Sequence, residues 1–162
     1  MKAYWHLHHW LLLEFSDNIE ERIRYINEEK PKDEIELRLK LLKEVKGNLP
    51  EEVIDKGIAN YEVLIEYDNA MEEYKTLYNS YQKALYEKTS EPTNITSTKL
   101  CKMAERIRDK YRTILTKKEQ AVDALNIYKE ALEFHREDLE VIHRLECPNC
   151  PWNGKTIFSK EV

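Results

Sequence analysis

The sequence predicts an all-α protein, a long antiparallel coiled-coil helical hairpin on a small base of short N-terminal helices and a C-terminal cysteine turn. Three observations lead to this fold class. Charged residues make up 35% of the chain and glycine only 3 of its 162 residues, a balance typical of long helices. Two long segments repeat apolar residues at alternating spacings of three and four, as one face of a helix requires. A polar stretch rich in turn-forming residues separates them.

Length and charge set the expected organisation. A chain of 162 residues is expected to form one domain, with N-terminal base segments over 1–49, a helical hairpin over 50–146 with its turn near 89–97, and a tail over 147–162. The formal net charge of −5 argues against a nucleic-acid partner or an anionic membrane surface. The apolar run "WLLL" is far too short to cross a membrane, and no export signal is recognisable. The expected location is therefore the cytoplasm, where thiols stay reduced.

The N-terminal base contains three short segments. Residues 3–15 are apolar and rich in histidine, and their pattern leaves helix and strand equally open. A helix is expected next, capped by Asp17 with Glu20 three residues further on, and ended by Pro31. Residues 34–45 fit both periods, and helix is favoured because no pairing strand is obvious nearby.

The hairpin is predicted from two long helices, near 51–88 and 98–145. The apolar face of the first is expected to consist of Leu64, Tyr67, Met71, Tyr74, Tyr78, Tyr81 and Leu85. The face of the second is expected to consist of Leu100, Ala104, Ile107, Tyr111, Ile114, Lys118, Ala121, Leu125, Tyr128, Leu132, His135, Leu139 and Ile142. Neither helix would be stable alone, because each apolar face must be covered.

Antiparallel pairing of these faces predicts where the chain ends meet. If Leu85 lies opposite Leu100, then Tyr74 lies near Tyr111. The second helix then extends about a dozen residues beyond the first, at about 1.5 Å per residue. The N-terminal segments are the available cover for its last turns. We therefore expect residues 3–46 to lie beside Cys147.

The C-terminal motif Cys147-Pro-Asn-Cys150 predicts a zinc site. Two thiols three positions apart can bind one zinc ion, and the intervening Pro and Asn favour the tight turn that brings both sulfurs together. His143 lies one helical turn earlier. The predicted fourth ligand comes from the N-terminal "HLHH", in which the candidates are His6, His8 and His9. Closed four-ligand coordination would make the site structural.

Other interpretations of these residues stay open. The two thiols are also compatible with a redox dithiol or with free thiols in a tail, although the βαβ context of thioredoxin-like enzymes is absent. Glu140-x-x-His143 is half of a di-iron bundle motif, and a second such pair is not found. No Gly-rich phosphate loop or catalytic triad can be placed. Whether the protein is an enzyme is therefore uncertain, and a non-enzymatic role is favoured.

The C-terminal stretch "ECPNCPWNGKTIF" resembles that of uncharacterised prokaryotic proteins that combine an N-terminal His-rich segment with a C-terminal C-P-x-C-P-W segment. The resemblance covers the two ends of the chain and implies no activity. The favoured function is a structural or protein-interaction protein with a coiled-coil rod and a zinc site joining its ends. The alternative is a thiol redox or metal-dependent enzyme.

Self-association is a further expectation, and it comes from a second apolar stripe beside the predicted hairpin face. Its members are Val63, Ala70, Leu77, Ala84, Leu115, Val122 and Ala124. A stripe that the hairpin leaves uncovered would pair two molecules into a four-helix bundle.

Overall fold

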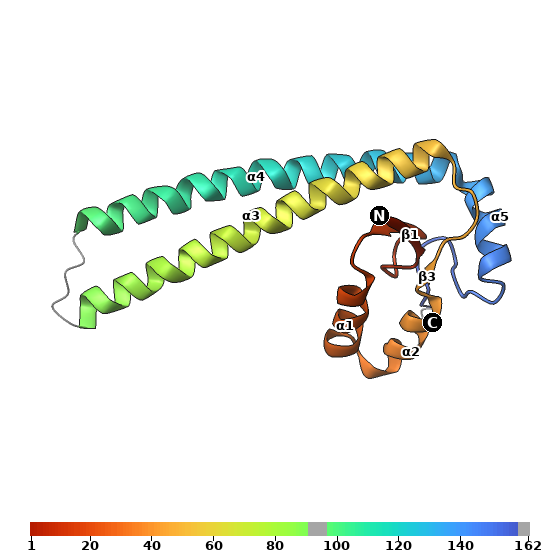
Figure 1. Ribbon diagram of the computed structural model, residues 1–162, viewed down its shortest axis with the longest axis horizontal. Coiled ribbons are helices and arrows are strands. Elements are labelled where there is room, and N and C mark those ends of the chain that lie inside the picture. Colours follow the sequence, from red (N-terminus) through yellow and green to blue (C-terminus); the bar gives the residue numbers. More distant parts are fainter. Residues whose placement is uncertain (91–96, 159–162) are drawn as a thin grey trace. The chain divides into compact units, whose positions relative to one another are not determined.

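The computed structural model describes residues 1–90 and 97–158 (Figure 1), so most of the predicted turn near 89–97 lies outside the described residues. The chain divides into two compact units. The first combines Met1–Tyr61 with Ile127–Val162, and the second is Glu62–Asn126. The first unit contains both ends of the chain, as predicted. Over the described residues, no helix is sufficiently long and apolar to cross a membrane.

The chain is mostly helical, but the all-α prediction is wrong in the first unit, which contains a three-stranded antiparallel sheet. The strands are β1 (Lys2–Trp5), β2 (Leu13–Ser16) and β3 (Lys43–Glu44), in the order β2-β1-β3. β1 pairs with β2 from Lys2 opposite Ser16 to Trp5 opposite Leu13. Within β2, Leu13 and Phe15 alternate with Glu14 and are buried, a period of two that a short segment shows only weakly in the sequence.

Two short helices follow the first two strands. Helix α1 (Ile19–Glu29) begins one residue later than predicted, because its N-cap is Asn18 and not Asp17. The Asn18 side chain accepts a hydrogen bond from the Glu21 backbone N–H at 3.1 Å and donates one to the Glu21 carboxylate at 2.9 Å. Helix α2 (Lys32–Leu41) confirms the helical interpretation of residues 34–41, and β3 follows it.

The long helices are α3 (Glu51–Ser90) and α4 (Ser97–Phe134), and a separate helix α5 (Arg136–Glu146) follows. The prediction of one helix from 98 to 145 is therefore wrong at His135, which forms a turn between α4 and α5. The backbone at His135 has φ −96° and ψ 18°, and its Nε2 lies 3.1 Å from the Glu52 carboxylate. This break gives α5 a direction of its own, and its buried residues are Leu139 and His143.

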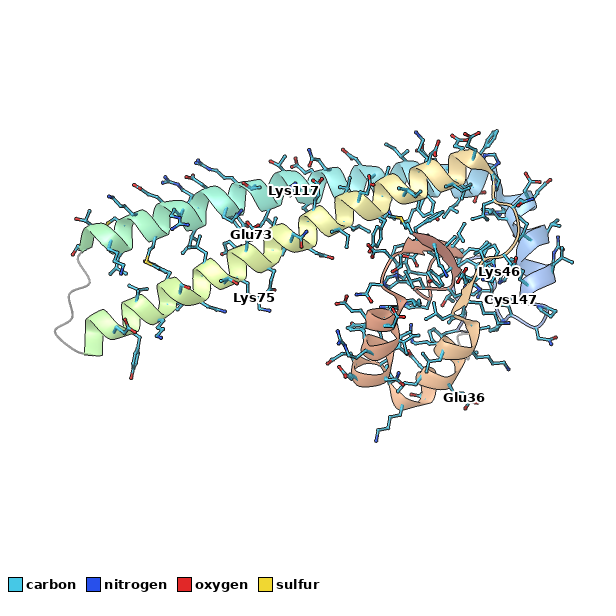
Figure 2. All side chains as sticks on the ribbon, in the orientation of Figure 1. Glu36, Lys46, Glu73, Lys75, Lys117 and Cys147 are labelled. Atoms are coloured by element: carbon cyan, nitrogen blue, oxygen red, sulfur yellow. The ribbon has the colours of Figure 1, made fainter. Side chains whose placement is uncertain are left out.

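In the second unit α3 and α4 pack in the predicted antiparallel sense (Figure 2). Glu66 forms an ion pair with Lys117, and Glu73 forms one with Lys110, as antiparallel packing requires. The rings of Tyr74 and Tyr111 are 6.1 Å apart, as the predicted register requires. The packed face of α3, however, is rotated from the predicted one. Its buried and half-buried apolar members are Val63, Tyr67, Ala70, Tyr74, Leu77, Tyr81, Ala84 and Leu85.

The same rotation applies to α4, where the packed face consists of Leu100, Met103, Ile107, Lys110, Ile114, Lys117, Ala121 and Ala124. Of the fifteen positions predicted in this unit, nine are buried or half-buried, Leu85 and Leu125 among them, and six are exposed, namely Leu64, Met71, Tyr78, Ala104, Tyr111 and Lys118. Both sets have the same spacing, and on α3 the structure packs the set that contains small residues. Ala70, Ala84 and Ala121 are buried, which allows the two backbones to approach closely.

The core of the first unit lies between the sheet and the ends of the helices. Its buried members come from β1, β2, α3, α4, α5 and the turn after α5, and comprise Trp5, Leu13, Phe15, Val53, Tyr128, Leu139 and Cys147. Gly57 in α3 is required by this packing, because a Cβ atom there would lie 2.2 Å from the Phe15 ring. A glycine that weakens the helix on its own is thus the position at which the sheet contacts α3.

Candidate metal centre

The first part of the centre is the loop that leaves strand β1. His6 has φ 54°, a left-handed backbone conformation that no other non-glycine residue in the described part of the chain adopts. The loop is closed by a hydrogen bond from the His6 N–H to the Leu12 carbonyl at 3.0 Å. This turn places the His6 imidazole inside the unit, with 3% of the residue exposed. Strained backbone of this kind persists where the surrounding structure holds it, and it is common at functional sites.

The second part is the end of helix α5 and the turn after it. His143 lies on the same face of α5 as Leu139, and both are buried. The helix ends with a hydrogen bond from the Cys147 N–H to the His143 carbonyl at 2.7 Å. The Cys150 N–H then bonds to the Cys147 carbonyl at 3.1 Å, which closes the predicted tight turn through Pro148 and Asn149.

Three donor atoms meet where the two parts touch. The Nε2 atom of His6 lies 2.9 Å from Nε2 of His143 and 3.1 Å from Sγ of Cys150. All three donor atoms lie within 4.8 Å of one another. In tetrahedral zinc sites neighbouring nitrogen and sulfur ligands are about 3.3–3.6 Å apart. The separations of His6 from His143 and from Cys150 are about half an ångström shorter than this, and His143 and Cys150 lie within 4.8 Å of each other, so small movements of the donor atoms would accept a zinc ion at their centre.

Burial keeps the imidazoles of this centre neutral. Removal from water lowers the pKa of His6 to about 3, and the neighbouring His143 lowers it further while the Leu11 backbone opposes the shift. Burial also lowers the pKa of His143. Neutral imidazole is the form that binds a metal. The second ring nitrogen of His6, Nδ1, is buried without a hydrogen bond of normal geometry to the described residues.

Burial shifts the pKa of the thiols in the opposite direction. Burial raises the pKa of Cys147 and of Cys150, so both are protonated at neutral pH when no cation is bound. A bound divalent cation reverses this preference, because a coordinating thiol loses its proton to the metal. A thiol that attacks a substrate needs a lowered pKa and a basic partner. Cys150 and His6 are 3.1 Å apart but have neither property.

The predicted ligands therefore divide into those that meet and those that do not. His6, His143 and Cys150 come together. Cys147 is buried in the core next to this group and is not one of the three whose donor atoms converge. His8 is bound to Glu14, whose carboxylate also accepts the His8 backbone N–H at 2.8 Å. His9 contacts the tail, because its carbonyl accepts the Ile157 N–H and its ring lies beside Thr156.

Aromatic side chains enclose the centre. The Trp5 ring lies 5.1 Å from the His143 ring, and the Trp152 ring lies 5.3 Å from the His6 ring. Trp5 has no exposed surface. These tryptophans reduce the access of water to the three donor atoms, a feature of the shell around metal sites. Sequence reasoning did not assign them, although Trp5 directly precedes the His-rich stretch and Trp152 follows Cys150 by two residues.

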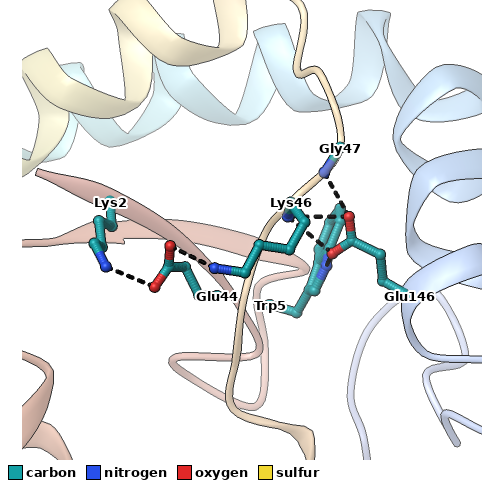
Figure 3. Close-up of polar contacts among 6 residues, drawn as sticks. All are labelled: Lys2, Trp5, Glu44, Lys46, Gly47 and Glu146. Atoms are coloured by element: carbon teal, nitrogen blue, oxygen red, sulfur yellow. Dashed lines mark hydrogen bonds and ion pairs between the residues drawn. The ribbon is translucent and has the colours of Figure 1, made fainter.

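Glu146 joins three segments beside the centre (Figure 3). Its carboxylate accepts the Trp5 indole N–H at 2.8 Å and the backbone N–H groups of Lys46 and Gly47 at 3.0 and 2.6 Å. A second contact in the same view joins the Glu44 carboxylate to the ammonium groups of Lys2 and Lys46, each at 2.7 Å. Glu146 thus holds strand β1, which leads directly into His6, to the helix that carries His143.

Comparisons with protein families, with curated proteins and with solved structures find no match for this chain. The resemblance of its two ends to uncharacterised prokaryotic proteins stays a prediction. Functional inference therefore depends on the geometry of the centre and of the hairpin.

Proposed function

We propose that this chain is a non-enzymatic structural and protein-interaction protein, in which one zinc ion joins the two chain ends and the helical hairpin presents a surface to a partner. The observation that carries the proposal is the convergence of His6, His143 and Cys150. These residues lie in a strand-end loop, a helix and a C-terminal turn, so a metal bound to them would hold three separate segments together. Two imidazoles and one thiolate are ligands that zinc prefers.

Cys147 is the proposed fourth ligand. It is buried, it lies in the same tight turn as Cys150, and it is near enough for its charge to raise the pKa of the Cys150 thiol. Rotation of its side chain toward the three converged donors would complete a closed tetrahedron. Four protein ligands leave no open position for a substrate, so the site would be structural.

The enclosure of the centre and the raised thiol pKa values favour this role over the alternative of a thiol redox enzyme. A redox cysteine is partly exposed and its thiolate is stabilised. Cys147 is buried among apolar residues, and burial favours its protonated form.

Zinc content tests the proposal, measured on protein purified without a histidine tag. We expect about one zinc ion per chain, consistent with one closed four-ligand site. His6→Gln and Cys150→Ser should lose most of it. The matched controls are His8→Gln, which changes a neighbouring histidine bound to Glu14, and Cys101→Ser, which changes an exposed cysteine on α4. Both controls should retain zinc. Metal-free wild type, or equal zinc content in His6→Gln and His8→Gln, would contradict the proposal.

Cobalt substitution tests the ligand set separately. Cobalt(II) bound to thiolates gives charge-transfer absorption whose intensity follows the number of sulfur ligands. Wild type is expected to show two thiolates, and Cys147→Ser and Cys150→Ser one each. An unchanged spectrum in Cys147→Ser would remove Cys147 from the ligand set.

A further inference from the structure

An exposed apolar stripe runs along one side of the hairpin in the second unit. On α3 it consists of Leu64, Met71 and Tyr78, seven residues apart and 37, 39 and 41% exposed. On α4 it consists of Tyr111, Leu115 and Val122, all at least 44% exposed. We call these six residues the lateral stripe. The two halves belong to one side, because the Tyr74 ring contacts both Tyr78 and Tyr111, with ring centres 6.0 and 6.1 Å apart.

The opposite side of the hairpin is polar. There Lys110 binds Glu73 and Lys117 binds Glu66, which closes the contact between α3 and α4 with charges. Along α3 the packed face and the lateral stripe together form a band of three apolar positions in every seven residues, whereas on α4 Lys110 and Lys117 occupy two of the packed positions. A band of this width is typical of four-helix bundles, whereas a two-stranded coiled coil needs only two positions. Helix α3 thus has the surface pattern of a helix in a four-helix bundle.

The charges beside the lateral stripe are self-complementary. Asp68 and Lys75 lie seven residues apart on α3, on either side of Met71, and line the same surface hollow as Met71, Tyr74 and Tyr78. Figure 2 labels Lys75 on this helix. Asp68 makes no ion pair with another described residue, and the Lys75 ammonium makes an exposed contact of 3.6 Å with Glu72. If two α3 helices meet antiparallel around Met71, Asp68 of each copy faces Lys75 of the other, and Leu64 faces Tyr78.

We propose that the lateral stripe is covered by the lateral stripe of a second copy of this chain, so that two hairpins form a four-helix bundle with the α3 helices antiparallel around Met71. This inference names a partner for the interaction role proposed above. It replaces the α3 part of the stripe expected from the sequence, because Val63, Ala70, Leu77 and Ala84 are packed inside the hairpin, and it keeps Leu115 and Val122 of the α4 part. A twofold contact uses the same patch on both copies, which is what the order of Asp68 and Lys75 provides.

Light scattering tests the stripe with a matched pair of variants. Wild type should be a dimer at micromolar concentration. Met71→Glu should be monomeric, because it places two carboxylates face to face at the centre of an apolar contact. Ile65→Glu is the control, since Ile65 is equally exposed at 41% but lies outside the stripe. It should remain dimeric. Circular dichroism must show equal helix content in both variants. A monomeric wild type at high micromolar concentration, or dissociation by Ile65→Glu alone, would overturn the proposal.

Charge reversal tests the antiparallel arrangement. Asp68→Lys and Lys75→Asp should each weaken the dimer about tenfold, because each places like charges opposite one another twice per dimer. An equimolar mixture of the two variants should form heterodimers in native mass spectrometry, since every facing pair is then opposite in charge. The double variant Asp68→Lys with Lys75→Asp should dimerise like wild type. Absence of heterodimers and of rescue would overturn the antiparallel pairing around Met71.

The outcome is independent of the zinc assay, because the lateral stripe and the metal centre lie in different units. A zinc-free wild type that dimerises through Met71 would contradict the zinc site and support this inference. A wild type that binds zinc but stays monomeric would support the zinc site and contradict this inference.

Discussion

Nε2 of His6 lies 2.9 Å from Nε2 of His143, although 137 residues separate the two in the chain. Both imidazoles are buried and neutral, so one can donate a hydrogen bond to the other, but a single hydrogen bond contributes only about 1 kcal/mol to stability. Closing a chain segment of this length costs considerably more entropy than that. The contact therefore depends on the surrounding core and, as we propose, on a metal ion.

Metal removal should loosen the first unit and leave the second unchanged. With a chelator present, we expect faster amide hydrogen exchange over residues 2–16 and 139–157, because the bonds that join these segments are lost. Residues 64–87 and 97–124 of the second unit should exchange as before. The expected loss of local stability is several kcal/mol, as for other structural zinc sites. Equal protection of residues 2–16 with and without chelator would show that zinc does not join the ends.

Glu146→Gln should destabilise the first unit by about 1–3 kcal/mol. The amide can accept through one oxygen only, and its NH₂ group would face the N–H donors of Trp5, Lys46 and Gly47. Urea denaturation followed by tryptophan fluorescence measures the change. Glu130→Gln on exposed α4 surface is the control and should lie within about 0.5 kcal/mol of wild type. A similar effect of the two substitutions would contradict the role assigned to Glu146.

The helical part of the fold was predictable because it depends on periodicity, and periodicity also explains the main error. Along α3 three positions in seven are apolar, so two overlapping faces have the same alternating spacing of three and four. The interpretation based on Leu64, Met71 and Tyr78 chose the larger side chains. The structure packs Ala70 and Ala84, because close approach of the two helices favours small residues. The small sheet was missed since its strands have only two to four residues.

The chemistry of the candidate site was predictable from the sequence, but only some of its residues were. The Cys-x-x-Cys spacing predicts a tight turn, and the sequence places His143 one helical turn earlier. Which N-terminal histidine would meet them depends on the left-handed backbone at His6 and on Glu14, which binds His8. Neither the backbone conformation of His6 nor the contact between Glu14 and His8 can be predicted from the local sequence pattern. Glu146 could not be identified either, because its three donors come from segments distant in the sequence.

Gly57→Ala should destabilise the protein although alanine is the better helix former. The substitution gains about 1 kcal/mol in helix propensity, but its Cβ would lie 2.2 Å from the Phe15 ring. Phe15 is held in turn by the Tyr128 ring, with ring centres 6.3 Å apart, so it cannot move freely. We expect a net loss of about 1–3 kcal/mol in thermal or urea unfolding.

A double variant tests whether the contact with Phe15 causes this loss of stability. Adding Phe15→Leu to Gly57→Ala removes the ring that the new methyl group would meet. The double variant should then lose less stability than the two single variants added together. If Gly57→Ala stabilises the protein, the close approach of Phe15 to α3 is wrong.

Ile114→Asp should unfold the hairpin of the second unit. Ile114 is 5% exposed in the packed face of α4, and a buried carboxylate without a counter-ion costs several kcal/mol. Circular dichroism should show a large loss of helix content or a much lower melting temperature. Gln120→Asp, at an exposed position of the same helix, should melt near wild type. Unchanged melting of Ile114→Asp would contradict the packed face.

Tyr128 should make the protein less stable at high pH. Its hydroxyl is buried and donates a hydrogen bond to the Leu13 carbonyl at 2.9 Å, and burial raises its pKa well above the usual value of 10.0. Above pH 10 the unfolded chain loses this proton while the folded chain keeps it, so the folded state binds more protons. Stability then falls as pH rises, by up to about 1.4 kcal/mol per pH unit. Below pH 10 both states are protonated and the contribution is constant.

Tyr128→Phe isolates this contribution from the other groups that titrate in the same range. At pH 8 the variant should be about 1 kcal/mol less stable than wild type, because the Leu13 carbonyl loses its donor. Between pH 10 and 11 the difference should shrink and then change sign, since phenylalanine has no proton to lose. Urea unfolding at a series of pH values measures the difference directly, with Tyr25→Phe as the control for loss of an exposed tyrosine hydroxyl. A difference that stays constant from pH 8 to 11 would mean that the Tyr128 hydroxyl reaches solvent and is not held in the core between the sheet and α4.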